Sequence, residues 1–342
     1  MTLHLVLPDG VDDLRRPSGG NVYDRRLAAA LEARGVEVRE HPVGAAGLGS
    51  VLAGLPDAAL VLVDGLVAST TEVLVAESRR LRVAVLLHMP ESGPAEPAVL
   101  AAVAAVVTTS AWARGWVIDR LRIPPERVHV ARPGVEPGPV VTGSARGANL
   151  LCVGPLTPAK GYDDLLGALA DLADLDWHCR CAGALDLLPS YTDDFRARVR
   201  ELGLDGRIEL LGPLPPAALE ELRSASDLVV APSRRESYGM ALAEGLARGL
   251  PAIVTDVGGH AEALGAGGDG VVPGALVPAG APAALAEVLR GWLGDPGLRD
   301  RWRDAAAQRR RSLGTWEATA AEVSRVLNLV APDVVRTGET RR

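Results

Sequence analysis

The sequence predicts an α/β protein built from two doubly wound domains, on three observations. The chain has 342 residues, which is longer than most single hydrophobic cores. Short apolar strands alternate with helical segments in both halves, the pattern of a parallel sheet covered on both faces. Residues 136–148, rich in proline, glycine and small polar residues, separate the two runs as an interdomain linker does.

The first half contains five segments with the patterns of strands. We expect these strands at residues 3–7, 36–40, 59–63, 83–88 and 103–108. Apolar residues at helical spacing predict a helix over 21–34 that stops at Gly35, and Ser110 can cap another helix.

The same alternation restarts after the linker. Strands are predicted at residues 150–153, 177–182, 208–211, 228–231 and 251–255, and helices at 161–175, 192–202, 216–225, 238–248, 282–294, 297–311 and 316–329. We expect a first Rossmann-like domain at 1–140, a linker at 141–148 and a second Rossmann-like domain at 149–315. A C-terminal helix at 316–330 and a flexible tail at 331–342 complete the expected organisation.

Composition excludes several classes of protein. The formal net charge is -7 and the arginines are spread along the chain, which argues against a nucleic-acid partner. We expect no signal peptide and no membrane insertion, because no basic start precedes a long apolar run and no apolar window reaches about 18–20 residues. Three cysteines, Cys152, Cys179 and Cys181, are too few for a disulfide framework, so we expect a cytoplasmic protein.

Ligands of doubly wound sheets gather at the carboxyl ends of strands, near helix N-termini. Gly19 and Gly20 follow the first strand and would let the backbone approach a phosphate or a sugar; a plain glycine turn is the alternative. The loop is not GxGxxG, so a dinucleotide-dependent dehydrogenase is not predicted.

Lys160 lies in a strand–helix loop with Gly154 and is the only lysine of the chain. A lysine at such a position suits a diphosphate, because it is a mobile point charge. A solvated lysine at a helix start is the alternative. Because every other basic residue except histidine is an arginine, the presence of this one lysine favours a functional role for Lys160.

Residues 228–248 predict a strand, a loop carrying Arg234, Arg235 and Glu236, and a helix. Amides at the start of that helix would lie at the positive end of its dipole, where phosphate and sugar hydroxyls can bind. Glu244 lies about two turns further on. The alternative is that both glutamates belong to a solvated helix face.

Two further loops carry histidines. His88 ends a strand, where a sugar-contacting side chain is expected, although a lone histidine is usually structural. His260 follows Gly258 and Gly259, and is read either as a ligand contact or as a surface residue. Because the sequence has no HxH or CxxC pair, no metal site is predicted.

Together these loops resemble a known enzyme family. The chain contains, in order, a Gly-Gly loop, His88, Val-Gly-x5-Lys-Gly, Pro-Ser-x2-Glu-Ser-Tyr-Gly-x4-Glu and Thr-Asp-Val-Gly-Gly-x2-Glu. This order is similar to that of the family 4 (GT4) retaining glycosyltransferases. Their GT-B fold has two Rossmann-like β/α/β domains facing across a cleft. The resemblance runs from about Leu3 to Leu329, and its Glu-x7-Glu segment is the specific part.

The resemblance implies a nucleotide-diphosphate sugar, UDP- or GDP-linked, as co-substrate. The domain at 149–315 would bind this nucleotide sugar, and the domain at 1–140 would bind the acceptor. Lys160 would clamp the diphosphate, Glu236 would lie near the donor sugar and His88 would contact that sugar, the three forming the implied catalytic set. Glu244 would bind the ribose. The other implied donor-binding residues are Gly19, Gly20, Gly154, Arg234, Arg235, Ser237, Tyr238, Gly239, Met240, Gly258 and Gly259. No metal or other cofactor is implied, because lysine, arginine and helix dipoles stabilise the leaving diphosphate.

One departure from the family pattern keeps alternatives open. The family commonly places an arginine five residues before the lysine, and here that position is Pro155. Either Arg234 or Arg235 replaces its charge, or donor binding is weaker or different. The departure favours one alternative, a catalytically silent GT-B partner of another transferase. The main interpretation is transfer to a soluble acceptor, and a GT-B sugar epimerase or phosphorylase is a separate alternative.

Overall fold

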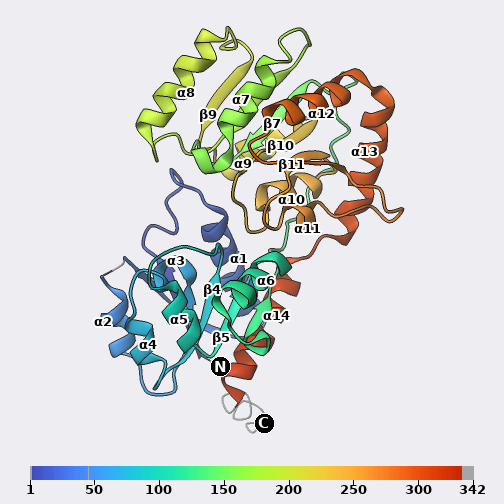
Figure 1. The fold of residues 1–342 in the computed structure, drawn as a ribbon. Helices are drawn as coiled ribbons and strands as arrows, with labels where there is room; N and C mark the ends of the chain where they lie inside the picture. Colours follow the sequence, from blue (N-terminus) through green and yellow to red (C-terminus); the bar gives the residue numbers. More distant parts are fainter. Residues whose placement is uncertain (1, 45, 333–342) are drawn as a thin grey trace. The chain divides into compact units, whose positions relative to one another are not determined.

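The computed structural model describes residues 2–44 and 46–332, and the chain divides into two compact units (Figure 1). Among the described residues, unit 1 is formed by 2–12, by Gly19–Gly134 without residue 45, and by 314–332. Unit 2 is formed by Asp13–Ser18 and Val135–Leu313. The division after Gly134 lies six residues before the end of the predicted first domain, so the whole predicted linker belongs to unit 2.

Unit 1 contains a six-stranded sheet in the order β2-β1-β3-β4-β5-β6, with every neighbouring pair parallel. Its central strands are runs of valine and leucine, and β3 and β5 are buried throughout, as expected for a sheet covered on both faces. The strands are β1 (Thr2–Pro8), β2 (Glu37–Val43), β3 (Leu60–Asp64), β4 (Arg82–Leu87), β5 (Ala105–Thr108) and β6 (Val128–Val130).

The helices of unit 1 cover this sheet. They are α1 (Gly19–Ala33), α2 (Leu48–Ala53), α3 (Gly65–Ala68), α4 (Val73–Glu77), α5 (Glu96–Ala102), α6 (Ala111–Leu121) and α14 (Trp316–Val330). A short 3-10 turn, η1, spans Pro125–Arg127. The Ser110 side chain accepts a hydrogen bond from Ala113 N at 3.0 Å, which caps α6 as its sequence predicts.

Unit 2 repeats the architecture with the strand order β12-β11-β10-β7-β8-β9, again all parallel. Its strands are β7 (Asn149–Val153), β8 (His178–Ala182), β9 (Ile208–Gly212), β10 (Leu228–Ala231), β11 (Ala252–Thr255) and β12 (Gly274–Val277). Its helices are α7 (Tyr162–Ala170), α8 (Pro189–Glu201), α9 (Pro216–Ser224), α10 (Met240–Leu246), α11 (His260–Leu264), α12 (Pro282–Gly294) and α13 (Pro296–Arg309), with 3-10 turns η2 (Pro158–Lys160) and η3 (Arg310–Ser312).

Helix α14 follows unit 2 in the sequence but packs in unit 1, against α1, β4 and β5. The Trp316 ring meets the Tyr23 ring edge-on at a centroid distance of 5.4 Å. Thr319 Oγ1 donates to the carbonyl oxygen of Arg132 at 2.7 Å. A Cβ on Gly134 would overlap the backbone of Trp316, so a glycine is needed where this helix begins.

Several elements differ from the sequence expectation. Helix α1 begins at Gly19 rather than at 21, and strands β6 and β12 were not predicted. Both strands are only three or four residues long, too short to show a period of two. Ala331, assigned to a flexible tail, is fully buried. Residues 333–342 of that predicted tail lie outside the described residues. No helix in the described ranges has the length and apolar character needed to cross a membrane.

Candidate functional site

The strand order of unit 2 reverses between β7 and β10, which are neighbours in the sheet. At such a switch point the loops after the two strands lead to opposite faces of the sheet, and ligands of doubly wound sheets bind in the crevice between them. A hydrogen bond connects these two loops, since Arg234 N donates to Ala159 O at 2.8 Å. Gly161 has φ +70°, and a Cβ on it would overlap the carbonyl of Pro232, so no other residue fits this junction.

An ion pair between Lys160 and Glu236 spans these loops. Lys160 Nζ lies 2.7 Å from Glu236 Oε2, with side chains 28% and 15% exposed. Burial opposes ionisation of both groups, but each charge favours the other. The pKa of Glu236 therefore lies below, and that of Lys160 above, its ordinary value. The aliphatic part of Lys160 lies over Gly154, where a Cβ would stand 3.4 Å from Lys160 Cδ.

The loop after β11 packs on the same segment. A Cβ on Gly258 would overlap the carbonyl of Glu236, and one on Gly259 would overlap that of Ser237. Backbone packing therefore accounts for both glycines, independently of a ligand. Gly239, the N-cap of α10, has φ +102°, and Ser237 and Tyr238 are buried beside it.

His260 is only 1% exposed, so the surface interpretation of this residue was wrong. The reason is that its ring packs under Gly239, where a Cβ would stand 2.8 Å from His260 Cδ2. Burial lowers the pKa of His260 and keeps the ring neutral. Its Nδ1 contacts Thr255 O at 2.9 Å, and Nε2 is a buried atom with no hydrogen-bond partner among the described residues. Apart from the adjacent glycines, nothing in the sequence indicated that His260 is buried.

Two other charged residues of the motif are bonded within unit 2. Glu244 accepts a hydrogen bond from Arg223 and remains 28% exposed. Arg234 forms two hydrogen bonds to Asp164, at 3.1 and 2.9 Å. Asp164 thus holds a side chain of the neighbouring loop.

Unit 1 has its own switch point, between β1 and β3. Gly19 and Gly20 begin α1 after β1, Asp64 ends β3, and His88 follows β4. His88 Nε2 lies 2.8 Å from Asp24 Oδ1 and 3.2 Å from Asp64 Oδ2. The three ligand-type atoms lie within 4.8 Å of one another, the one such His/Cys/Asp/Glu group in the described ranges.

The His88 ring has two further neighbours, Gly20 and Tyr23. A Cβ on Gly20 would stand 3.2 Å from His88 Cδ2, and Tyr23 meets the ring edge-on at 5.0 Å. The fold therefore brings His88 and Gly20 together in unit 1, as it brings Lys160, Glu236 and Gly258 together in unit 2. Sequence reasoning missed Asp24 and Asp64, although a polar residue ending a buried strand was a usable signal for Asp64.

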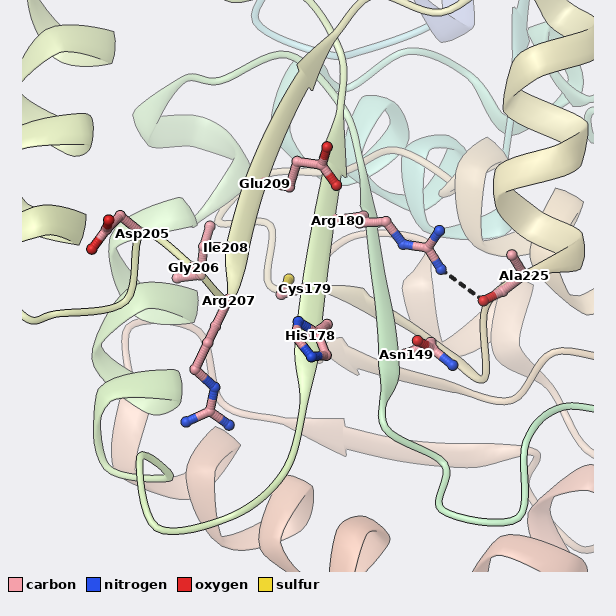
Figure 2. Close-up of a pocket in the computed structure, with 10 residues that line it drawn as sticks. All are labelled: Asn149, His178, Cys179, Arg180, Asp205, Gly206, Arg207, Ile208, Glu209 and Ala225. Carbon is pink, nitrogen blue, oxygen red and sulfur yellow. Dashed lines mark hydrogen bonds between the residues drawn. The ribbon is translucent and has the colours of Figure 1, made fainter.

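A cavity of about 570 Å³ lies elsewhere, at the amino ends of β7, β8 and β9 (Figure 2). Its arginines are bonded to the backbone. Arg180 donates to Ala225 O at 2.7 Å, as Figure 2 shows, and Arg207 stacks on Trp177 while bonding three carbonyl oxygens. This cavity is at the opposite end of the strands from Lys160 and Glu236.

The family model of the glycosyl transferases group 1 matches residues 145–309. This segment belongs to the group 1 glycosyl transferases. The match covers most of unit 2 and confirms the predicted family resemblance there.

Among curated relatives, the chain is 32% identical over 236 residues to the D-inositol 3-phosphate glycosyltransferase of Corynebacterium glutamicum, covering 63% of this chain and 55% of that protein. It is 33% identical over 241 residues to D-inositol 3-phosphate glycosyltransferase 1 of Catenulispora acidiphila, covering 65% and 57%. The matches thus span little more than half the length of these relatives.

Solved structures share the fold at low identity. Sucrose-phosphate synthase of Thermosynechococcus elongatus matches with a TM-score of 0.77 and 19% identity, over 96% of this chain and 99% of that one. Anabaena Alr3699/HepE, in complex with UDP and glucose, matches with a TM-score of 0.75 and 18% identity over 96% and 99%. The predicted α/β class with two Rossmann-like units is confirmed by these likenesses and by the two sheets.

Proposed function

We propose that the chain is a glycosyltransferase that moves a sugar from a nucleotide-diphosphate sugar to a soluble acceptor. The observation that carries the proposal is the Lys160–Glu236 pair at the switch point of a group 1 unit. A lysine beside a carboxylate at this position offers a cation for a diphosphate and an acceptor for sugar hydroxyls. The likeness to HepE, solved with UDP-glucose, supports a nucleotide-sugar donor, which we take to be UDP- or GDP-linked.

Lys160 can serve a diphosphate without leaving Glu236. An ammonium has three donors, and one contact to Glu236 is present. The remaining donors and the 28% exposure of the side chain leave room for a phosphate oxygen. Glu236 then acts as a binder and positioner of the donor sugar, with amides from Ser237 to Met240 on its phosphate or hydroxyls. We assign Glu244 to the ribose hydroxyls.

We further propose that transfer retains the anomeric configuration and needs no metal ion. Lys160 and the dipole of the segment that begins α10 would stabilise the charge developing on the leaving diphosphate. The test of this part is direct. Transfer should persist in excess EDTA, and the anomeric proton of the product should show the configuration of the donor in its NMR spectrum.

The first experiment is a melting-shift screen against UDP, GDP and their common sugars in EDTA, followed by product analysis with the best donor. D-inositol 3-phosphate belongs in the acceptor panel because the curated relatives carry that name. A shift with one nucleotide diphosphate, abolished in Lys160→Ala, supports the proposal. A folded protein that binds none of them contradicts it.

One observation favours a second candidate, a catalytically silent partner of another transferase. Pro155 stands where the resembling family has an arginine, and the Arg234 guanidinium already bonds Asp164. A replacement cation therefore has to come from Arg235 or from the substrate complex itself. A protein that binds a nucleotide diphosphate but transfers no sugar to any acceptor in the panel would support this second candidate.

A further inference from the structure

Three ionisable side chains of unit 1 converge on a single atom, His88 Nε2. The Asp24 side chain is fully buried, Asp64 is 3% exposed and His88 is 17% exposed. Both polar contacts of the imidazole use Nε2, at 2.8 Å and 3.2 Å. The nitrogen facing away from the carboxylates, Nδ1, is therefore the ring atom available to a substrate.

The charges of this cluster require a cation. Asp64 Oδ1 already accepts from Leu66 N at 2.7 Å and Val67 N at 3.2 Å, at the start of α3. Asp24 Oδ2 is buried with no hydrogen-bond partner among the described residues. Two carboxylates removed from water in this way are costly unless a positive charge stands between them. The imidazole is the group in that position.

Titration of the cluster follows from the same contacts. Burial by itself lowers the pKa of His88, but the charges and hydrogen bonds of Asp24 and Asp64 outweigh it and raise the pKa to about 10. Burial raises the pKa of Asp24 to about 6. Tyr23, the other titratable group against the ring, stays neutral, since burial raises its pKa and its hydroxyl donates to Ala131 O at 2.9 Å.

A divalent metal in place of the proton fits the distances less well. Zinc bonds of about 2.0–2.1 Å in tetrahedral geometry keep ligand atoms roughly 3.3 Å apart. The 2.8 Å separation of Nε2 and Asp24 Oδ1 is that of a charge-assisted hydrogen bond.

We propose that Asp24 and Asp64 are positioning residues that hold His88 as an imidazolium whose Nδ1–H donates to an oxygen of the bound substrate. The inference rests on the proposed glycosyl transfer for the substrate, but the protonation of His88 can be measured without it. It makes His88 a hydrogen-bond donor to a sugar or phosphate oxygen. It also removes His88 as the base that deprotonates the acceptor.

The decisive experiment is nitrogen NMR of protein with ¹⁵N-labelled histidine rings. The chain has six histidines, and His88→Gln assigns the signal. His88 should keep both nitrogens protonated from about pH 6 to about pH 9, whereas burial lowers the pKa of four of the others, His4, His41, His129 and His260.

Two variants, Asp24→Asn and Asp64→Asn, remove the negative charge of a carboxylate and keep the size and shape of the side chain. Asp64→Asn keeps an acceptor for the α3 amides, and Asp24→Asn keeps one for Nε2. Each should lower the titration midpoint of His88 by about one pH unit or more. Asp57→Asn is the matched control, because that carboxylate is 84% exposed and lies in unit 1, 3.3 Å from Arg80. It should leave the midpoint unchanged.

Kinetics separates positioning from a purely structural role. For the wild type, kcat should be flat from neutral pH to about pH 9. For Asp24→Asn it should fall about tenfold per pH unit above the new midpoint and recover at lower pH.

Three results would overturn the inference: a wild-type His88 that is neutral at pH 7, a midpoint unmoved in both variants, or stoichiometric metal that the variants lose. If no sugar is transferred at all, the proposed function fails while the NMR titration still decides the state of His88.

Discussion

The ammonium of Lys160 and the carboxylate of Glu236 lie 2.7 Å apart although the two residues come from loops after different strands, β7 and β10. Because both side chains are largely buried, each charge depends on the other for its stability. The same two residues are the proposed contacts of the donor. Stability and function of unit 2 are therefore linked through one pair.

A double-mutant cycle on this pair should separate the two properties. Lys160→Met and Glu236→Gln should each cost about 1–3 kcal/mol in the free energy of unfolding, less than for a fully buried pair, and the double variant should regain most of it. Sugar transfer should fall by a factor of about 10² or more in all three. Urea denaturation and transfer assays measure the two effects, and full activity in either single variant would refute the assigned site.

The pair also predicts a pH dependence of stability. The folded-state pKa of Glu236 is lowered below 4.5, its ordinary value, so its contribution is fully present above that value and is lost as the pH falls through the folded pKa. Glu236→Gln should therefore lose less stability than the wild type on acidification below about pH 4.5. Unfolding free energies at several pH values check this. Parallel curves for the two proteins would contradict it.

Gly258→Ala should destabilise unit 2 by about 2–4 kcal/mol, because the residue has φ +57° and its Cβ would overlap the carbonyl of Glu236. The matched control is Gly270→Ala, at φ +81° with nothing within 4 Å of the added Cβ. It carries only the backbone strain, about 1 kcal/mol. Equal losses in the two melting curves would show that the contact with Glu236 contributes nothing.

Gly20→Ala tests the setting of His88 by a steric route. The new Cβ would stand 3.2 Å from His88 Cδ2, so the ring has to shift by a few tenths of an ångström or the helix must move. We expect a loss of transfer of about tenfold or more, with a change of at most about 1 kcal/mol in stability. Gly115→Ala, in α6 with open space around the Cβ, should instead gain about 0.5–1 kcal/mol and keep its activity.

The sequence predicted the alternation of strands and helices well where segments are long or strongly apolar. Helix α12 (Pro282–Gly294) and strand β10 (Leu228–Ala231) have the predicted bounds. The loops that carry the candidate site could be identified because ligands bind at the carboxyl ends of the strands in doubly wound sheets. The alternation of strands and helices already shows which loops lie there. Lys160 and Glu236 both lie in such loops, and the structure places them close together.

What the sequence did not show was the burial of polar residues. In α1 the apolar side chain of Val22 is 38% exposed, whereas those of Tyr23 and Asp24 are fully buried. A pattern of apolar positions assigns an aspartate to the solvent-exposed face of a helix. It therefore misses a carboxylate such as Asp24, which is buried in contact with the His88 imidazole. The burial of His260 was missed because its ring packs against Gly239, a residue from another loop.

The return of α14 to unit 1 has a consequence for how the chain is made. A ribosome releases residues 135–313 of unit 2 before α14 emerges, so the earlier segments of unit 1 must wait for the helix that covers α1, β4 and β5. Unit 2 can complete its sheet first, although it comes second in the sequence. Until α14 has been made, the first unit lacks the side chains of Trp316, Val323 and Leu327, and the apolar surface that they cover is exposed to aggregation.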